Sequence, residues 1–218
     1  MTDDEGLIET MDQPPINEAT RSALAAPSDQ ELRIPCYCEE NVYRLVSRKL
    51  QSTKNDRYYV LFVSSETQCV PMFYQLAAKT PTAVCLWDYH VIVLRVSEEA
   101  HILDIDSNLP YPCPLHEYLH YAFPEQLPQD YAPLFRVVRA EVFLKNFYSD
   151  RMHMFQDDKW SATPPSYVCI QTKKGSNLDS YRIMTWKSDQ TTIVDERPFD
   201  HMYGAVLNRD QLLDYFGK

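Results

Sequence analysis

The sequence has little glycine. Only 4 of its 218 residues are Gly, and neither GxGxxG nor GxxxxGK[ST] occurs. Loops that cradle a nucleotide phosphate need glycine, because the backbone must approach the phosphate closely. Nucleotide binding through such loops is therefore not expected. The net charge is −10, and the sequence contains no cluster of Lys and Arg that could neutralise a phosphate backbone. No nucleic-acid partner is expected either.

Long hydrophobic runs are also missing. The longest aliphatic run is Val91–Leu94, far shorter than the roughly 20 residues that cross a bilayer. The first residues, MTDDEGLIETMDQ, are acidic and lack the apolar core of a secretory signal. The sequence therefore predicts no membrane association and a cytoplasmic location, or a nuclear one. The six cysteines are expected to be reduced thiols in such a compartment.

The cysteines and histidines do not have the spacing of a zinc site. Cys36 and Cys38 form a C-x-C pair, and the other pair at metal-ligand spacing is His116 and His120, in a segment rich in Tyr and Pro. Structural zinc sites usually combine two well-spaced pairs. We therefore expect no metal ion and no cofactor.

The chain is long enough for one domain with a substantial core and for little else. Residues 1–33 are acidic and rich in Pro, Ser and Ala, which predicts a flexible N-terminal tail. Residues 34–218 are predicted to form a single catalytic α/β domain. A polar stretch at 181–200 is typical of an insertion. A monomer is expected.

Hydrophobic periodicity predicts helices mixed with antiparallel strands, an α+β fold. After Cys38, the residues Val42, Leu45 and Val46 form the apolar stripe of an amphipathic helix, so Cys38 lies at its N-terminus. The other predicted helices span 116–122, 141–147 and 208–216. The predicted strands span 58–64, 69–74, 83–87, 89–96, 101–105, 135–139 and, within long loops, 167–170.

Cys38, His90 and Asp104 are the candidates for chemistry. A thiol at a helix start lies in a field that favours the thiolate, and an imidazole held by a carboxylate can exchange protons with it. The strands that carry His90 and Asp104 are predicted to form a hairpin. A turn over residues 97–100 offsets the two by about three residues, which a three-residue turn or a bulge would correct. From residue types alone, Asp106 serves as well as Asp104.

Several strings resemble one enzyme family in order along the chain. They are CYCEENVYRL (36–45), VCLWDYHVIVL (84–94), LDIDSNLPYPCP (103–114), FRVVRAEVFLKNFYSDRMHM (135–154), PPSYVCI (164–170) and GAV (204–206). Together they resemble the protein N-terminal glutamine amidohydrolases, from about Pro35 to the C-terminus.

The resemblance implies a papain/transglutaminase-like scaffold, in which the nucleophile at a helix N-terminus packs on an antiparallel sheet that carries His and Asp. It assigns the nucleophile to Cys38, the base to His90 and the carboxylate to Asp104. It implies conversion of an N-terminal Gln of a peptide or protein to Glu with release of ammonia through a Cys thioester. The new Glu would then enter an N-degron pathway through an arginyl-transfer step.

The substrate's α-ammonium requires an acceptor. Glu39 and Asp88, which flank the candidate catalytic residues in sequence, are candidates, whereas Trp87 and Tyr89 are candidates for walls around the Gln methylenes. Helix-dipole, capping and core roles explain the same residues equally well. The polar residues of the string LKNFYSDRMHM are expected to order a loop bordering the site: Asn146, Asp150, Arg151 and His153. A cysteine protease, a transglutaminase-type acyl transferase and a non-enzymatic N-terminal peptide-binding module remain alternatives.

Overall fold

A computed structural model describes residues 27–52, 55–170, 175–184 and 197–217. Its centre is an antiparallel sheet of six strands, which confirms the predicted α+β class. In spatial order the strands are β10 (Ala205–Asn208), β7 (Leu134–Arg139), β1 (Arg57–Ser64), β4 (His90–Val96), β5 (Ala100–Leu103) and β6 (Cys113–Pro114).

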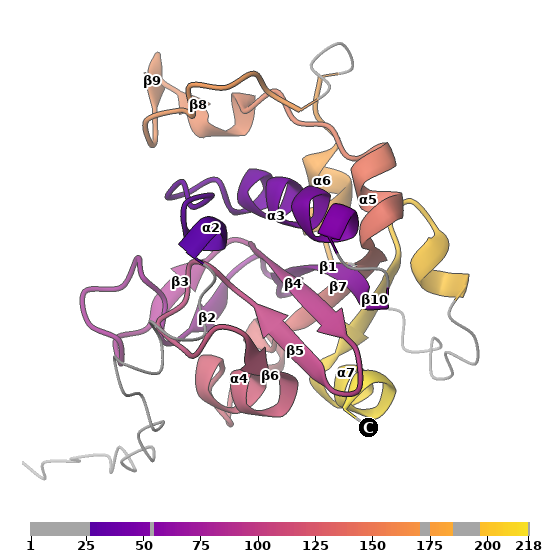
Figure 1. Cartoon of the computed structure of the whole chain (residues 1–218). Coiled ribbons are helices and arrows are strands. Elements are labelled where there is room, and N and C mark those ends of the chain that lie inside the picture. The colour runs from indigo at the N-terminus through magenta and orange to yellow at the C-terminus, as the bar shows by residue number, and fades with distance from the viewer. Residues whose placement is uncertain (1–26, 53–54, 171–174, 185–196, 218) are drawn as a thin grey trace, which may run out of the picture.

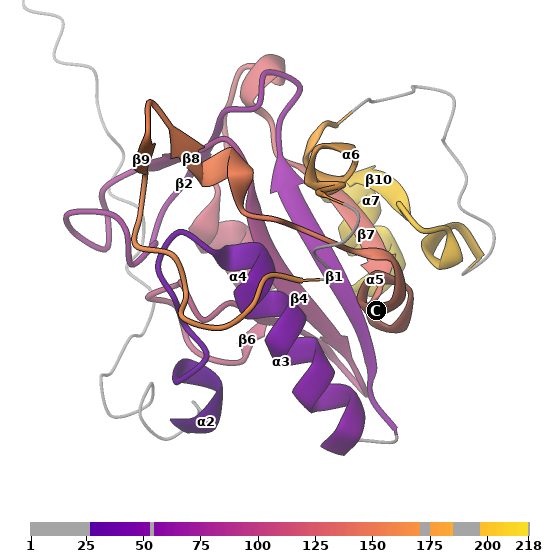
Figure 2. The same cartoon turned by 90° about the horizontal axis from the view of Figure 1, so that it is seen from above.

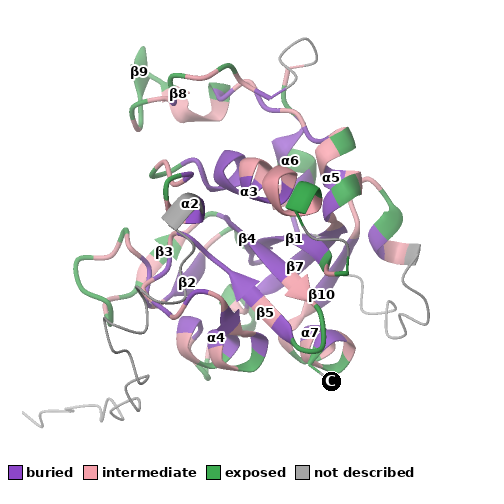
Figure 3. Ribbon diagram, viewed as in Figure 1, coloured by how far each residue is buried: buried purple, intermediate pink, exposed green. Residues whose placement is uncertain are grey.

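Helices cover both faces of this sheet, as Figures 1 and 2 show. One face packs against α3 (Cys38–Ser52), α5 (Ala140–Asn146) and α6 (Leu178–Arg182). The other packs against α4 (Leu115–Ala122) and α7 (Arg209–Phe216). The sequence of a strand that is covered by helices on both faces is expected to be a continuous apolar run. Strand β1 is such a case, since every residue from Tyr58 to Ser64 is buried (Figure 3).

Side chains of β1 alternate between the two cores. Val60 and Phe62 belong to the core beneath α3, whereas Leu61 and Val63 belong to the core above α4 and α7. This period of two is the ordinary consequence of strand geometry. The same alternation determines on which face of the sheet the side chain of a residue near a strand end lies.

Helix α3 begins at Cys38, as the sequence predicts. Val42, Leu45 and Val46 are buried in the core beneath it, and the acidic side chains of its first turn suit the positive end of the helix dipole. The apolar stripe thus holds α3 flat on the sheet and brings its first residue to the end of the strands.

Smaller elements surround the sheet. The strands predicted at 69–74 and 83–87 pair with each other as β2 (Val70–Met72) and β3 (Cys85–Trp87). An unpredicted hairpin pairs β8 (Phe155–Gln156) with β9 (Lys159–Trp160). Asp157 and Asp158, which connect them, both have positive φ, as a tight hairpin turn of type I′ requires. The strand expected at 167–170 is reduced to a bridge between Ile170 and Ser149. Single turns form η1 (Gln129–Tyr131), η2 (Met152–Met154) and η4 (Arg197–Asp200).

The folded body begins before Ile34. Helix α2 (Pro27–Gln30) carries Asp29, which is buried and accepts hydrogen bonds from Lys49 Nζ at 2.6 Å and Tyr111 Oη at 2.9 Å. Asp29 and Leu32, which the sequence assigns to the tail, are therefore packed, because Asp29 has hydrogen-bond partners that composition does not reveal. Residues 1–26 of the expected tail and 185–196 of the expected insertion lie outside the described residues. Among the helices described, none is long and apolar enough to cross a membrane.

Candidate active site

Cys38 is the first residue of α3, and its thiol is nearly buried. The Sγ atom lies 3.7 Å from Glu39 Oε2. Burial raises the pKa of the Cys38 thiol well above its usual value, and the charges of Glu39 and Asp106 act in the same direction, whereas a hydrogen bond from the Val91 backbone lowers it. Desolvation outweighs the helix-start field here. In the resting site the thiol is therefore protonated.

His90 and Asp104 are brought together at the end of β4 and β5. His90 Nε2 lies 3.1 Å from both carboxylate oxygens of Asp104. The two strands pair with Val93 opposite Leu103 around a turn at residues 97–99. Extending this register puts Asp104 opposite Ile92, a diagonal neighbour of His90, which long side chains can bridge. A three-residue turn thus reduces the offset expected from the sequence from about three residues to two.

Asp104 is held by further donors besides His90. Tyr118 Oη on α4 donates to Oδ2 at 2.7 Å, and the Asp106 backbone N–H donates to Oδ1 at 2.9 Å. Burial opposes ionisation of Asp104, but these donors and His90 prevail and hold its pKa below the usual value. Burial likewise opposes charge on His90, and the Asp104 carboxylate nevertheless raises the pKa of the imidazole.

The two ring nitrogens of His90 differ in their surroundings. A carboxylate only accepts hydrogen bonds, so Nε2 carries the proton in the neutral ring and Nδ1 carries the lone pair. Nδ1 is buried and has no hydrogen-bond partner among the residues described, Cys38 included. Trp87 stacks on the ring, with centroids 5.6 Å apart and planes inclined by 15°. The ring is therefore fixed from one side and free to accept a proton at the other.

Asp106 has other partners. Its carboxylate accepts from Arg33 Nε at 2.7 Å and from Asn41 Nδ2 at 3.3 Å. The Asn41 side chain also exchanges two hydrogen bonds of 2.9 Å with the backbone of Ile34. Asp106 therefore ties the segment before α3 to the loop after β5, and Asp104 is the carboxylate that contacts His90.

A cavity of about 420 Å³ joins these groups. Of the residues predicted for the site, Cys38, Trp87, Asp88, Tyr89 and His90 line it, whereas Glu39 and Asp104 lie behind its wall. Asp106, His153 and Arg182 also line the cavity. The string LKNFYSDRMHM does border the site, but the sequence offers no reason to single out His153. Arg182 lies in the segment interpreted as an insertion.

Glu39 has a different environment from the one its sequence position suggests. It is fully buried, and its Oε2 accepts a hydrogen bond from Tyr89 Oη at 3.1 Å. Its Oε1 lies 3.6 Å from His153 Nε2. Burial raises the pKa of the Glu39 carboxyl to about 7. Asp88 is exposed instead and forms a 3.1 Å ion pair with Arg182.

Glu40, next in sequence, is paired by an arginine distant in the chain. Arg151 donates to the two Glu40 oxygens at 2.6 and 2.8 Å, and both side chains are buried. Arg151 has a positive φ of 65° and precedes η2, which carries His153. This bidentate pair therefore fixes the position of His153 relative to α3.

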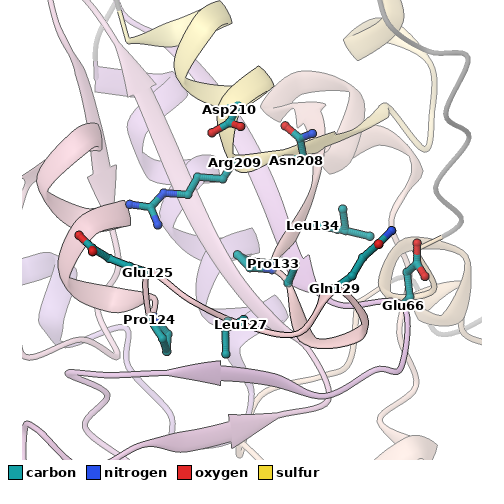
Figure 4. A pocket seen from close by; sticks show the side chains of 11 residues that line it. Glu66, Pro124, Glu125, Leu127, Gln129, Pro133, Leu134, Asn208, Arg209 and Asp210 are labelled. Atoms are coloured by element: carbon teal, nitrogen blue, oxygen red, sulfur yellow. The ribbon is translucent and has the colours of Figure 1, made fainter. Parts of the chain in front are cut away.

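A second cavity, of about 350 Å³, lies at the start of β7 (Figure 4). Its wall comes from the loop after β1, the segment between α4 and β7, and the start of α7. Its polar side chains include Glu66, Glu125, Gln129 and Arg209. None of the predicted site residues contributes to it. Within the described ranges, no group of His, Cys, Asp and Glu is arranged to hold a metal ion.

A thiol and an imidazole that line one cavity, with a carboxylate bound to that imidazole, are the groups of a cysteine-dependent acyl-transfer enzyme. Residues 33–216 match the family described as N-terminal glutamine amidase. The chain belongs to this family.

Curated relatives carry the name protein N-terminal glutamine amidohydrolase. The Arabidopsis thaliana protein is 34% identical over 216 residues, which cover 91% of this chain and 97% of the relative. The Bos taurus protein is 38% identical over 172 residues, 74% of this chain and 81% of the relative. The Homo sapiens protein is 35% identical over 191 residues, 82% and 91% respectively.

Proposed function

We propose that this protein hydrolyses the side-chain carboxamide of an N-terminal glutamine, giving an N-terminal glutamate and ammonia. The family match over residues 33–216 carries this proposal, since it spans the whole candidate site. The cavity supports it, because the cavity is lined by a thiol and a histidine suited to amide chemistry. The substrate is a peptide or protein with a free N-terminal Gln, and no cofactor is required.

The reaction begins with proton transfer from Cys38 to Nδ1 of His90. The thiolate attacks the carboxamide carbon, and the tetrahedral intermediate collapses as the imidazolium gives its proton to the departing NH₂ group. Ammonia leaves and a γ-glutamyl thioester remains. A water molecule then loses a proton to His90 and attacks the thioester, which releases glutamate and regenerates the thiol.

Asp104 keeps the His90 ring productive through this cycle. Its hydrogen bonds at Nε2 hold the lone pair at Nδ1 before attack and stabilise the imidazolium afterwards. The thiol hydrogen bond goes to Glu39 in the resting site, so attack requires the thiol to turn from Glu39 towards Nδ1. The backbone N–H of Cys38 at the helix start is a candidate donor to the oxyanion.

The other cavity residues would bind the substrate. Trp87 and Tyr89 line the cavity with aromatic surface, which suits the Gln methylenes. Two carboxylates are candidates for the negative charge that the α-ammonium requires, Asp88 on the cavity wall and Glu39 behind it.

Three broader proposals accompany the reaction. The scaffold is papain/transglutaminase-like, supported by a helix-start cysteine packed on an antiparallel sheet that carries His90 and Asp104. The protein works as a monomer in the cytoplasm or nucleus, where its six cysteines, all free thiols, would stay reduced. Its product would supply an arginyl-transfer step of an N-degron pathway.

The test is to incubate the protein with otherwise identical peptides that carry N-terminal Gln, N-terminal Asn, internal Gln or N-acetyl-Gln. Ammonia release and a mass gain of about one unit, as NH₂ is exchanged for OH, are expected with N-terminal Gln only. Backbone cleavage would instead indicate a protease, and incorporation of an added amine would indicate a transglutaminase.

Two variants connect that activity to the proposed residues. Cys38→Ala and His90→Ala should each abolish ammonia release, while Cys36→Ala, two residues from the nucleophile, should retain it. If Cys38→Ala still deamidates the peptide, the assignment of the nucleophile is wrong. A protein that binds the peptide without turnover, with Cys38 no more reactive to iodoacetamide than the other thiols, would be a binding module.

A further inference from the structure

A second histidine, His153 on η2, lines the cavity together with the thiol. Its side chain is 15% exposed, and its Nε2 lies 3.4 Å from Tyr89 Oη and 3.6 Å from Glu39 Oε1. The hydroxyl of Tyr89 already donates to Glu39 Oε2. Both neighbours of Nε2 are therefore acceptors towards it, and Nε2 carries the ring proton.

The other ring nitrogen of His153, Nδ1, then carries a lone pair that accepts no hydrogen bond from the described residues. Nδ1 is buried and has no hydrogen-bond partner within the described part of the chain. Burial, with Arg182 nearby, lowers the pKa of this imidazole, so the ring is neutral at physiological pH. A neutral ring on a cavity wall with a spare acceptor is suited to a ligand that donates hydrogen bonds.

Negative charge behind the ring determines what kind of donor fits. Glu39 Oε1, like His153 Nδ1, has no hydrogen-bond partner among the residues described. Four groups face Glu39: Cys38 and Glu40 on α3, Tyr89 before β4 and His153 on η2. The nearest cation on the cavity wall is Arg182, which is already paired with Asp88 and Asp179. A buried carboxylate of this kind favours a cationic donor nearby.

We propose that His153 Nδ1 accepts a hydrogen bond from the substrate's α-ammonium, while Glu39, whose Oε1 lies 3.6 Å from Nε2 of the same ring, provides the counter-charge. This assignment rests on the proposed function and adds a specificity-determining residue, His153, and a positioning residue, Glu39. A peptide whose amino group is acetylated cannot provide the charge, and one that lacks the amino group provides neither charge nor donor.

Asp88 is the rival receptor for the ammonium. Its side chain is 57% exposed and is already engaged by Arg182, so water and an existing cation compete for it. Glu39 itself does not line the cavity, which is why the histidine in front of it is the contact.

The experiment compares two substrates that share one nucleophile. One is a Gln-initiated peptide, and the other is the same peptide with the Gln replaced by a 4-carbamoylbutanoyl group, which lacks only the amino group. The ratio of their kcat/KM values isolates recognition of the ammonium, because changes in thiol reactivity affect both substrates. His153→Phe should lower this ratio about ten- to a hundredfold, the usual loss of one charge-assisted hydrogen bond.

Matched variants make the result specific. His153→Asn, which retains an acceptor, should keep a ratio between those of wild type and His153→Phe. His116→Phe, the same replacement at a side chain that is 75% exposed, should leave the ratio unchanged. Glu39→Gln should lower the ratio, and adding it to His153→Phe should lower it little further, because the two residues act as one unit. An unchanged ratio in His153→Phe, or a collapse in Asp88→Asn alone, overturns the proposal.

Binding separates this inference from the proposed function. In the full-length Cys38→Ala protein, affinities for the two peptides are measured by calorimetry with and without His153→Phe. Preference for the free amino group that disappears with His153→Phe supports the receptor, even if wild type releases no ammonia. Ammonia release by wild type without such a preference supports the reaction and refutes the receptor.

Discussion

The site contains two histidine–carboxylate pairs, and they differ in how the carboxylate is held. Asp104 accepts hydrogen bonds from His90, Tyr118 and a backbone N–H, and its pKa is lowered. Glu39 is equally buried, but within the described residues only its Oε2 accepts hydrogen bonds from other side chains, those of Tyr89 and Cys38, and its pKa is raised to about 7.

The pKa values of the two histidines are shifted in opposite directions. The pKa of His90 is raised by a firmly ionised partner, whereas the pKa of His153 is lowered by burial. Contact with the ionised Asp104 carboxylate thus makes His90 the stronger base, whereas burial and the nearby Arg182 make His153 the weaker one. A strong base suits proton transfer with a thiol, and a weak one suits a hydrogen-bond acceptor for a cation.

The largest effect should follow from breaking the first pair. Asp104→Asn replaces an acceptor with an amide that can favour the wrong tautomer of His90, and kcat/KM for a Gln-initiated peptide should fall about a thousandfold or more. Asp106→Asn is the matched control, because Asp106 contacts Arg33 and Asn41 instead of His90, and its effect should be below about tenfold. Equal losses in the two variants would contradict the pairing of His90 with Asp104.

Much of the first pair was predictable from the sequence, and the second was not. A cysteine at a helix start and a hairpin that carries His90 and Asp104 follow from hydrophobic periodicity and turn signals. The resemblance of the string LDIDSNLPYPCP (103–114) then selected Asp104 over Asp106. His153 is 115 residues from Cys38 and lies on a single turn of 3-10 helix, which has no periodicity to recognise.

Position along the chain also misled about Glu39. A carboxylate in the first turn of a helix is usually solvated and serves the dipole, but here α3 starts inside the protein, beneath η2 and Tyr89. Its burial depends on segments that no local pattern connects. The β8–β9 hairpin, by contrast, could have been predicted from the adjacent residues Asp157 and Asp158. Aspartate tolerates the positive φ that this turn requires at both positions.

The second pair can be disturbed without touching either of its members. Arg151→Met leaves Glu40 buried and unpaired, which should destabilise the fold by about 3 kcal/mol and lower Tm by about 10 °C for a chain of this size. Arg151 lies over the Tyr167 ring at 5.1 Å, and Arg44 lies over the same ring at 4.6 Å. Arg44→Met is the control, because Arg44 forms no buried ion pair with the described residues. Thermal unfolding followed by circular dichroism measures both, and a loss no larger than that of Arg44→Met would mean that the Glu40 pair does not anchor η2.

The smallest effect is the dependence of ammonium recognition on pH. Glu39, with a pKa raised to about 7, takes up a proton as the pH falls, and a neutral carboxyl no longer favours a cation. On the alkaline side the substrate's amino group loses its charge near pH 7.7–8.0. The ratio of kcat/KM between the Gln peptide and its des-amino analogue should therefore be bell-shaped, falling about tenfold from pH 7.5 to 6. Glu39→Gln should remove the acid limb and keep the alkaline one, which belongs to the substrate. If the acid limb survives in Glu39→Gln, the group that titrates is His153 itself, and Glu39 does not provide the counter-charge for the ammonium.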